Sequence, residues 1–142
     1  MTRRQAMLVV TACCLPAIGI GPALAQDPRG TIAQKEARNW LALTDRGDGL
    51  ASWRAAGKQF QSAITADKWA DSLRMVRPPL GALIERSVLS TQFMKNIPGA
   101  PDGDYAVLEF RASFANKTDS RETISLEHEA DGTWRVIGYF IH

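Results

Sequence analysis

Two arginines and a glutamate are the residues whose types and positions most clearly predict chemistry. Glu122 has the same strand parity as Ile124 and Leu126, and alternation therefore places its carboxylate on the covered face of a sheet. Such a carboxylate needs a partner, because burying an unpaired charge is costly. Arg77 or Arg86 can supply a bidentate partner. Two interpretations stay open: an ion pair that fixes the helices to the sheet, or a charge that anchors a ligand in a pocket.

Acid–base catalysis would need titratable side chains that face a shared cavity, and the candidates are Glu122, His128 and Tyr139. We interpret His128 as a structural residue, since it lies close to the predicted turn at Asp131. The other histidine is the last residue, His142, and two histidines without a placed carboxylate do not predict a metal site. The chain after residue 25 contains no HExxH, GxSxG, P-loop or GxGxxG motif. We therefore expect neither a metal nor a cofactor.

The first 25 residues have the parts of a secretory signal peptide. A short basic start contains Arg3 and Arg4, and an apolar stretch over residues 6–24 ends in small residues. This pattern predicts cleavage after Ala25. Removing 25 of the 142 residues leaves 117, which fits one domain (residues 26–142) in the periplasm or secreted from the cell.

Two other fates of the N-terminal segment are open, and so is its export route. A retained membrane anchor would need a continuous apolar span, but four prolines and glycines interrupt residues 6–25. A lipoprotein would carry its lipid on Cys13, but the apolar region before the lipoprotein-like sequence is only five residues long, from Ala6 to Val10. The sequence Thr2-Arg3-Arg4 resembles the start of a twin-arginine signal, so either the Sec or the twin-arginine route is consistent with it.

The composition of the mature chain excludes several classes of protein. The whole chain has 17 basic and 15 acidic residues, and two arginines but no acid lie in the signal peptide, so the mature domain is formally neutral. A neutral domain without basic clusters lacks the positive surface with which proteins bind nucleic acid. Both cysteines, Cys13 and Cys14, also lie in the signal peptide. The mature domain therefore has no thiol for a disulfide, a redox motif or a metal site.

Helical periodicity covers the first half of the mature chain. The sequence Thr31–Gln34 fits a capping box, and the helix that follows it stops near Gly47. Asp48 can cap a second, short helix and Thr65 a third, which ends at the Pro78-Pro79 pair. The predicted buried face of the first helix consists of Ala33, Ala37, Trp40, Leu41 and Thr44. That of the third helix consists of Ala66, Trp69, Ala70, Leu73 and Val76.

Beyond Gly81 the pattern changes to alternation, which predicts strands. Residues 82–96 are typical of a long strand with weak facial polarity, and residues 105–114 of a strand whose even-numbered side chains are buried. A third strand surrounds Ile124, and the Asp131-Gly132 pair predicts a two-residue hairpin turn before the last strand. The predicted register pairs Ala130 with Thr133, Leu126 with Ile137, Ile124 with Tyr139 and Glu122 with Ile141.

The last strand has apolar residues on both faces. In the predicted register Trp134, Val136 and Phe140 lie on the face away from the helices. Either this second face is covered within the chain, or it is an interaction surface with Trp134 and Phe140 as its candidate residues. The partners expected at such a surface are a second copy, forming a homodimer, or another envelope protein.

Helices followed by strands predict an α+β fold with N-terminal helices packed on a curved antiparallel sheet of about four strands. Several segments together resemble the bacterial exported family catalogued as domain of unknown function 4019. These segments are WLALTD (40–45), SW (52–53), RPPLG (77–81), PGAPDGDY (98–105) and WRVIGYFI (134–141). The resemblance implies a bacterial envelope protein and brings no known activity. The order of elements is also similar to the nuclear transport factor 2-like (NTF2-like) and cystatin-like folds, in which a curved sheet wraps a long helix.

These observations favour a non-catalytic binding module that holds a small apolar ligand or a protein partner on its sheet or in the cone between sheet and helices. The candidate pocket residues are Arg77, Arg86, Glu122 and Tyr139. The alternative is a small isomerase, dehydratase or hydrolase, because NTF2-like enzymes such as ketosteroid isomerase and scytalone dehydratase place Asp, His or Tyr in that cone. A third hypothesis is an accessory domain of an envelope or secretion assembly.

Overall fold

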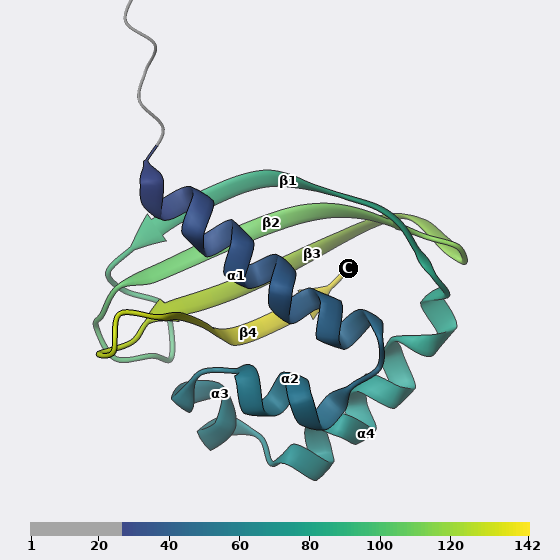
Figure 1. The fold of residues 1–142 in the computed structure, drawn as a ribbon, viewed down its shortest axis with the longest axis horizontal. Coiled ribbons are helices and arrows are strands. Elements are labelled where there is room, and N and C mark those ends of the chain that lie inside the picture. Colours follow the sequence, from purple (N-terminus) through teal and green to yellow (C-terminus); the bar gives the residue numbers. More distant parts are fainter. Residues whose placement is uncertain (1–26) are drawn as a thin grey trace, which may run out of the picture.

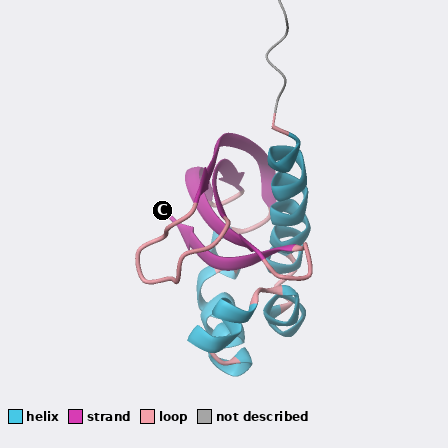
Figure 2. Cartoon of the chain, turned by 90° about the vertical axis from the view of Figure 1, so that its left-hand side faces the viewer, coloured by secondary structure: helices cyan, strands magenta, loops and turns pink. Residues whose placement is uncertain are grey.

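A long helix and a four-stranded antiparallel sheet form the main layers of the protein. The computed structural model describes residues 27–142; the predicted signal peptide, its cleavage site at Ala25 and the alternative lipidation site at Cys13 lie outside the described residues. The strands follow the chain in the order β1 (Leu83–Met94), β2 (Tyr105–Phe114), β3 (Lys117–His128) and β4 (Trp134–Ile141). The sheet is open and curved, with the long helix α1 along its inner side (Figure 2).

Four helices precede the sheet, followed by a short 3₁₀ turn. They are α1 (Pro28–Asp45), α2 (Gly49–Ala55), α3 (Lys58–Ala63) and α4 (Ala66–Val76), and the 3₁₀ turn is Pro78–Leu80. Helix α1 crosses the sheet diagonally, whereas α2, α3 and α4 lie beyond the β4 edge (Figure 1). Within residues 27–142, no helix combines the length and the apolar composition that crossing a membrane requires. The predicted α+β architecture is confirmed.

The core lies between α1 and the inner face of the sheet. The predicted buried face of α1 is confirmed for all five of its residues, and the even-numbered side chains of β2 from Ala106 to Phe114 are fully buried. Trp40 joins the layers: its indole N–H donates to the Ser52 carbonyl at 2.8 Å, and its ring packs edge-on against Phe60 and Tyr139. Such aromatic pairs add to the free energy that burial already supplies.

The helix boundaries follow local capping chemistry, with one correction. Helix α1 begins at Pro28, three residues before the predicted capping box at Thr31, because the Asp27 carboxylate accepts the Arg29 amide at 3.0 Å and proline suits a first helical position. The predicted caps at Asp48 and Thr65 are confirmed, since each side chain accepts an amide of its helix. Helix α3 was not predicted; its six residues are too few to show a period.

Helix α4 buries less than its pattern predicts. Only Leu73 of its predicted face is fully buried, and Val76 is 51% exposed. The reason is its packing partner: α4 packs against α2, where Gly49 lies so close that an added Cβ would stand 2.7 Å from Ala70. The side of α4 that faces β4 is left partly open.

Two bulges explain why β1 has weak facial polarity in the sequence. The pairing with β2 shifts at Ile84 and again at Leu89, and both of these side chains are exposed. A bulge adds one residue to a strand and therefore exchanges the faces of the residues that follow. The inward residues of β2 consequently pair with Arg86 and Val88 before the second bulge and with Thr91 after it. Even-numbered residues of β1 thus face inward before this bulge and an odd-numbered one after it.

The register between β3 and β4 corrects two predicted pairs and the face of two residues. The turn contains three residues, because Glu129 rather than Ala130 opposes Thr133, and the Glu129 amide donates to the Thr133 carbonyl at 2.9 Å. Leu126 therefore pairs with Val136 instead of Ile137, and a bulge at Ile137 restores the predicted pairs of Ile124 and Glu122. The shift turns Val136 and its neighbour Trp134 inward, so these two residues are covered within the chain.

Candidate functional site

The predicted partner of Glu122 is Arg86. Strand β1 places Arg86 opposite Ala112 and strand β3 places Glu122 opposite Phe110, so both side chains point to the inner face. Arg86 donates to Glu122 through Nε to Oε1 at 2.7 Å and through Nη2 to Oε2 at 3.1 Å, a bidentate pair. Glu122 is fully buried, with 0% of its surface exposed, and this pair satisfies its charge.

Asp45 at the end of α1 extends the pair into a network that reaches Arg77. Arg86 Nη1 donates to Asp45 Oδ2 at 2.8 Å, and Arg86 Nη2 donates to Asp45 Oδ1 at 3.0 Å. Arg77, at the end of α4, donates from Nε to Asp45 Oδ1 at 3.3 Å and from Nη1 to the Gly81 carbonyl at 2.5 Å. Two carboxylates and two guanidinium groups thus alternate and balance in charge.

Tyr139 closes the other end of the network. Its hydroxyl donates to Glu122 Oε2. Burial, together with the negative charge of Glu122, raises the pKa of the Tyr139 phenol well above its ordinary value. Burial alone would lower the pKa of the Arg86 guanidinium, but its hydrogen bonds to Asp45 and Glu122 outweigh burial and raise that pKa. We call Asp45, Arg77, Arg86, Glu122 and Tyr139 the ion-pair network.

The ion-pair network joins the helices to the sheet. It links the ends of α1 and α4 to strands β1, β3 and β4, which is what the interpretation as a fixing ion pair requires. Glu122 accepts hydrogen bonds from Arg86 and Tyr139, and Tyr139 uses its hydroxyl proton in that bond, so in this arrangement neither side chain is available as a free acid or base. Arg77, by contrast, keeps donors free, since it uses only two of the five N–H donors of a guanidinium in these bonds.

Asp45 is the member of the network that the sequence interpretation missed. A signal for it exists: Asp45 follows Ala37 and Leu41 at successive steps of four, which places it on the buried face of α1. A charged residue that continues an apolar helix face calls for a buried partner. The burial of Asp45 is not evident from the sequence, because Asp45 lies at the end of the helix, where a carboxylate is usually solvated.

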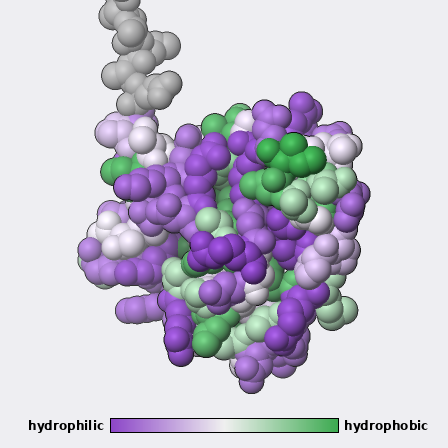
Figure 3. Space-filling view, turned by 45° about the vertical axis from the view of Figure 1, so that its right-hand side comes forward, coloured by the Kyte–Doolittle hydropathy of each residue, from purple (hydrophilic) through white to green (hydrophobic). Residues whose placement is uncertain are grey.

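An apolar groove separates α4 from the second half of β4. It has a volume of about 210 Å³ and is lined mainly by Trp69, Leu73, Val76, Tyr139, Phe140 and Ile141, with Arg77 at its border. We call it the α4–β4 groove. Phe140 lies on its rim with 67% of its surface exposed. On the face shown in the space-filling view, hydrophobic residues gather in small patches between hydrophilic ones (Figure 3).

The two residues expected at an interaction surface have different positions. Trp134 is 6% exposed and packs in the core against Phe93 and His128, whereas Phe140 remains exposed. A separate hollow of about 290 Å³, between α1, α2 and β4, is lined in part by Trp40, Trp134 and Val136. Among residues 27–142, no group of three or more His, Cys, Asp or Glu side chains is arranged to hold a metal ion.

Comparison with protein families gives a match over residues 36–139 to a family described as "Protein of unknown function (DUF4019)". The chain belongs to this family. The DUF4019 match includes every residue of the ion-pair network and all of α2, α3 and α4. A search of curated protein sequences returns no match. The match therefore identifies the family to which the chain is related but assigns the chain no activity.

Proposed function

We propose that the protein is an exported binding module whose α4–β4 groove holds an apolar side chain of a protein partner. The observation that carries the proposal is the exposed Phe140 on the rim of an apolar groove. Tyr139 lines the groove, but its hydroxyl is bound to Glu122, so binding there would rest on apolar contact.

The size of the groove favours a side chain over a whole small molecule. Pockets that enclose small-molecule ligands have volumes of about 300–1,000 Å³. The α4–β4 groove, at about 210 Å³, is smaller than this and open at its rim, where Phe140 and Val76 are largely exposed. One or two apolar side chains of a polypeptide can fill it, and the exposed rim can contact the neighbouring backbone.

The structure of the groove is independent of a partner. Leu73 is buried by packing within the chain, and Tyr139 is held by Glu122 and by the Trp40 ring. A preformed site loses less side-chain entropy on binding than a surface that must reorganise. The exposed Phe140 and Val76 then supply apolar area that leaves water only when a partner is bound.

A library of random ten-residue peptides, displayed with free carboxyl ends, tests the proposal. We expect selection on the wild-type protein to enrich peptides with an apolar residue at one fixed position. The variant Phe140→Ser should lose this enrichment, whereas Ile84→Ser should keep it, because Ile84 is equally exposed at 66% but lies in β1, outside the groove. Absence of enrichment, or equal enrichment on Phe140→Ser, would contradict the proposal.

Export is part of the proposal and rests on the N-terminal sequence. The signal-peptide pattern supports cleavage after Ala25 in a bacterial cell. N-terminal sequencing of protein recovered from the periplasm should begin at Gln26. A chain that still begins at Met1, or one that carries a lipid on Cys13, would contradict cleavage after Ala25 and indicate an anchored protein.

A further inference from the structure

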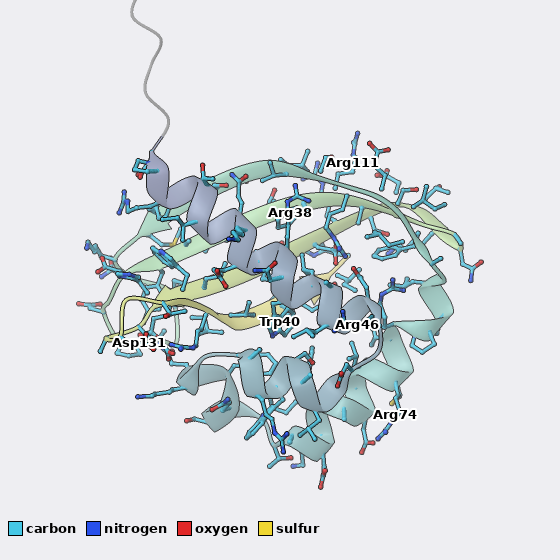
Figure 4. The ribbon with its side chains drawn as sticks, in the orientation of Figure 1. Arg38, Trp40, Arg46, Arg74, Arg111 and Asp131 are labelled. Carbon is cyan, nitrogen blue, oxygen red and sulfur yellow. The ribbon has the colours of Figure 1, made fainter. Side chains whose placement is uncertain are left out.

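A second hollow lies beside the α4–β4 groove, and Arg77 borders both. It has a volume of about 420 Å³ and is lined in part by Asp45, Arg46, Gly81 and Leu83. We call it the Arg77 pocket. Figure 4 shows Arg46 at the end of α1, on the side of the molecule where β1 begins. The pocket therefore opens where the loop after α1 meets the connection from α4 to the sheet.

Arg77 brings unused hydrogen-bond donors to this pocket. It is 5% exposed, and its guanidinium stacks on the Phe114 ring at 4.6 Å. Nε donates to Asp45 and Nη1 to Gly81, but Nη2 has no acceptor among residues 27–142. Nη2 is not fully covered, so a ligand can reach it. By contrast, all three nitrogens of Arg86 donate to carboxylates.

The charges around the pocket favour an anion. Within the ion-pair network the charges of Asp45 and Glu122 balance those of Arg77 and Arg86. Arg46 is exposed on the rim and makes no ion pair with the described residues, so it adds one uncompensated positive charge. A carboxylate in the pocket would accept hydrogen bonds from Arg77 Nη2 and be neutralised by Arg46.

We infer that the protein binds the carboxyl end of a polypeptide: the last side chain, an apolar one, fills the α4–β4 groove while the α-carboxylate binds Arg77. This inference rests on the proposed function and names the chemistry of the partner. The shared border at Arg77 explains how one residue of the partner can reach both hollows. Capture of a terminal carboxylate by charge-assisted hydrogen bonds is an established mode of peptide recognition.

The test compares two synthetic forms of the most enriched library peptide, one ending in a free carboxylate and one in an amide. We expect the acid to bind the wild-type protein at least about tenfold more tightly, since the free energy of a hydrogen bond to a charged group corresponds to a change in affinity of that order. The enriched sequences should also place their fixed apolar residue at the last position. Calorimetric titration of both peptides measures the ratio of their dissociation constants.

A charge variant locates the effect in the protein without disturbing the buried network. Arg46→Gln should lower the ratio of acid to amide affinity, whereas Arg111→Gln, the same change on an exposed residue of β2, should leave the ratio at its wild-type value. Equal affinity of acid and amide, with enrichment intact, would overturn the carboxylate inference and leave the proposed function standing. If the library yields no peptide that depends on Phe140, both are overturned.

Discussion

Replacing Glu122 by glutamine removes one charge from the ion-pair network and keeps its shape. Glu122 is fully buried, and Arg86 binds both of its oxygens, at 2.7 and 3.1 Å. Breaking a buried ion pair by neutralising one partner costs about 3–5 kcal/mol, because the other charge remains buried. Here Asp45 still pairs with Arg86, at 2.8 Å, so we expect the low end of that range, about 3 kcal/mol.

Urea unfolding measures this loss as a lower transition midpoint at unchanged slope. The control is Asp119→Asn, because Asp119 lies 3.9 Å from Arg111 in an exposed pair that should contribute less than about 1 kcal/mol. The double variant Glu122→Leu with Arg86→Met should be more stable than Glu122→Leu alone, since it leaves Asp45 paired with Arg77, whereas the single variant leaves one buried guanidinium in excess. A loss below about 1 kcal/mol for Glu122→Gln would refute the view that the network joins the helices to the sheet.

Three further predictions concern the pKa of Tyr139, the close contact at Gly49 and the burial of Trp134. The folded state holds the Tyr139 proton more tightly than the unfolded chain, so stability should fall as pH rises above about 10, by up to about 1.4 kcal/mol per pH unit, and Tyr139→Phe should remove this loss in urea titrations. Gly49→Ala should destabilise by about 1–3 kcal/mol because its Cβ would stand 2.7 Å from Ala70, whereas Gly30→Ala, with no atom within 4 Å, should stabilise slightly. Trp134→Ala should cost about 3–5 kcal/mol and Phe140→Ala less than about 1 kcal/mol by thermal unfolding; similar losses would contradict their different burial.

The elements of the fold were predictable where one residue type or one period determines them. The inner face of α1 and the alternation of β2 follow directly from periodicity, and the caps at Asp48 and Thr65 follow from side-chain chemistry. The bulge at Ile137 was not predictable, because it depends on how the turn and the neighbouring strand fit together. The three-residue turn brings Trp134 to the core side, and the bulge restores the predicted register for the rest of β4.

The candidate site was predictable in part. Strand parity identified Glu122 as buried, and the cost of an unpaired buried charge predicted Arg77 or Arg86 as its partner; in the structure Glu122 is buried and Arg86 is that partner. The link through Asp45 joins residues 41 positions apart in the chain, and no local pattern encodes such a contact. The α4–β4 groove exists because α4 packs against α2 and leaves Val76 uncovered, which is a property of tertiary packing.

The most direct test of the central claim is the position at which a selected peptide binds. Amide and indole N–H resonances of the protein can be recorded with and without the most enriched library peptide. We expect the largest shifts at the Trp69 indole and the backbone amides of Val76 and Phe140, which line the α4–β4 groove. The largest shifts around Trp134, in the hollow between α1 and β4, would contradict it, and so would a spectrum that does not change.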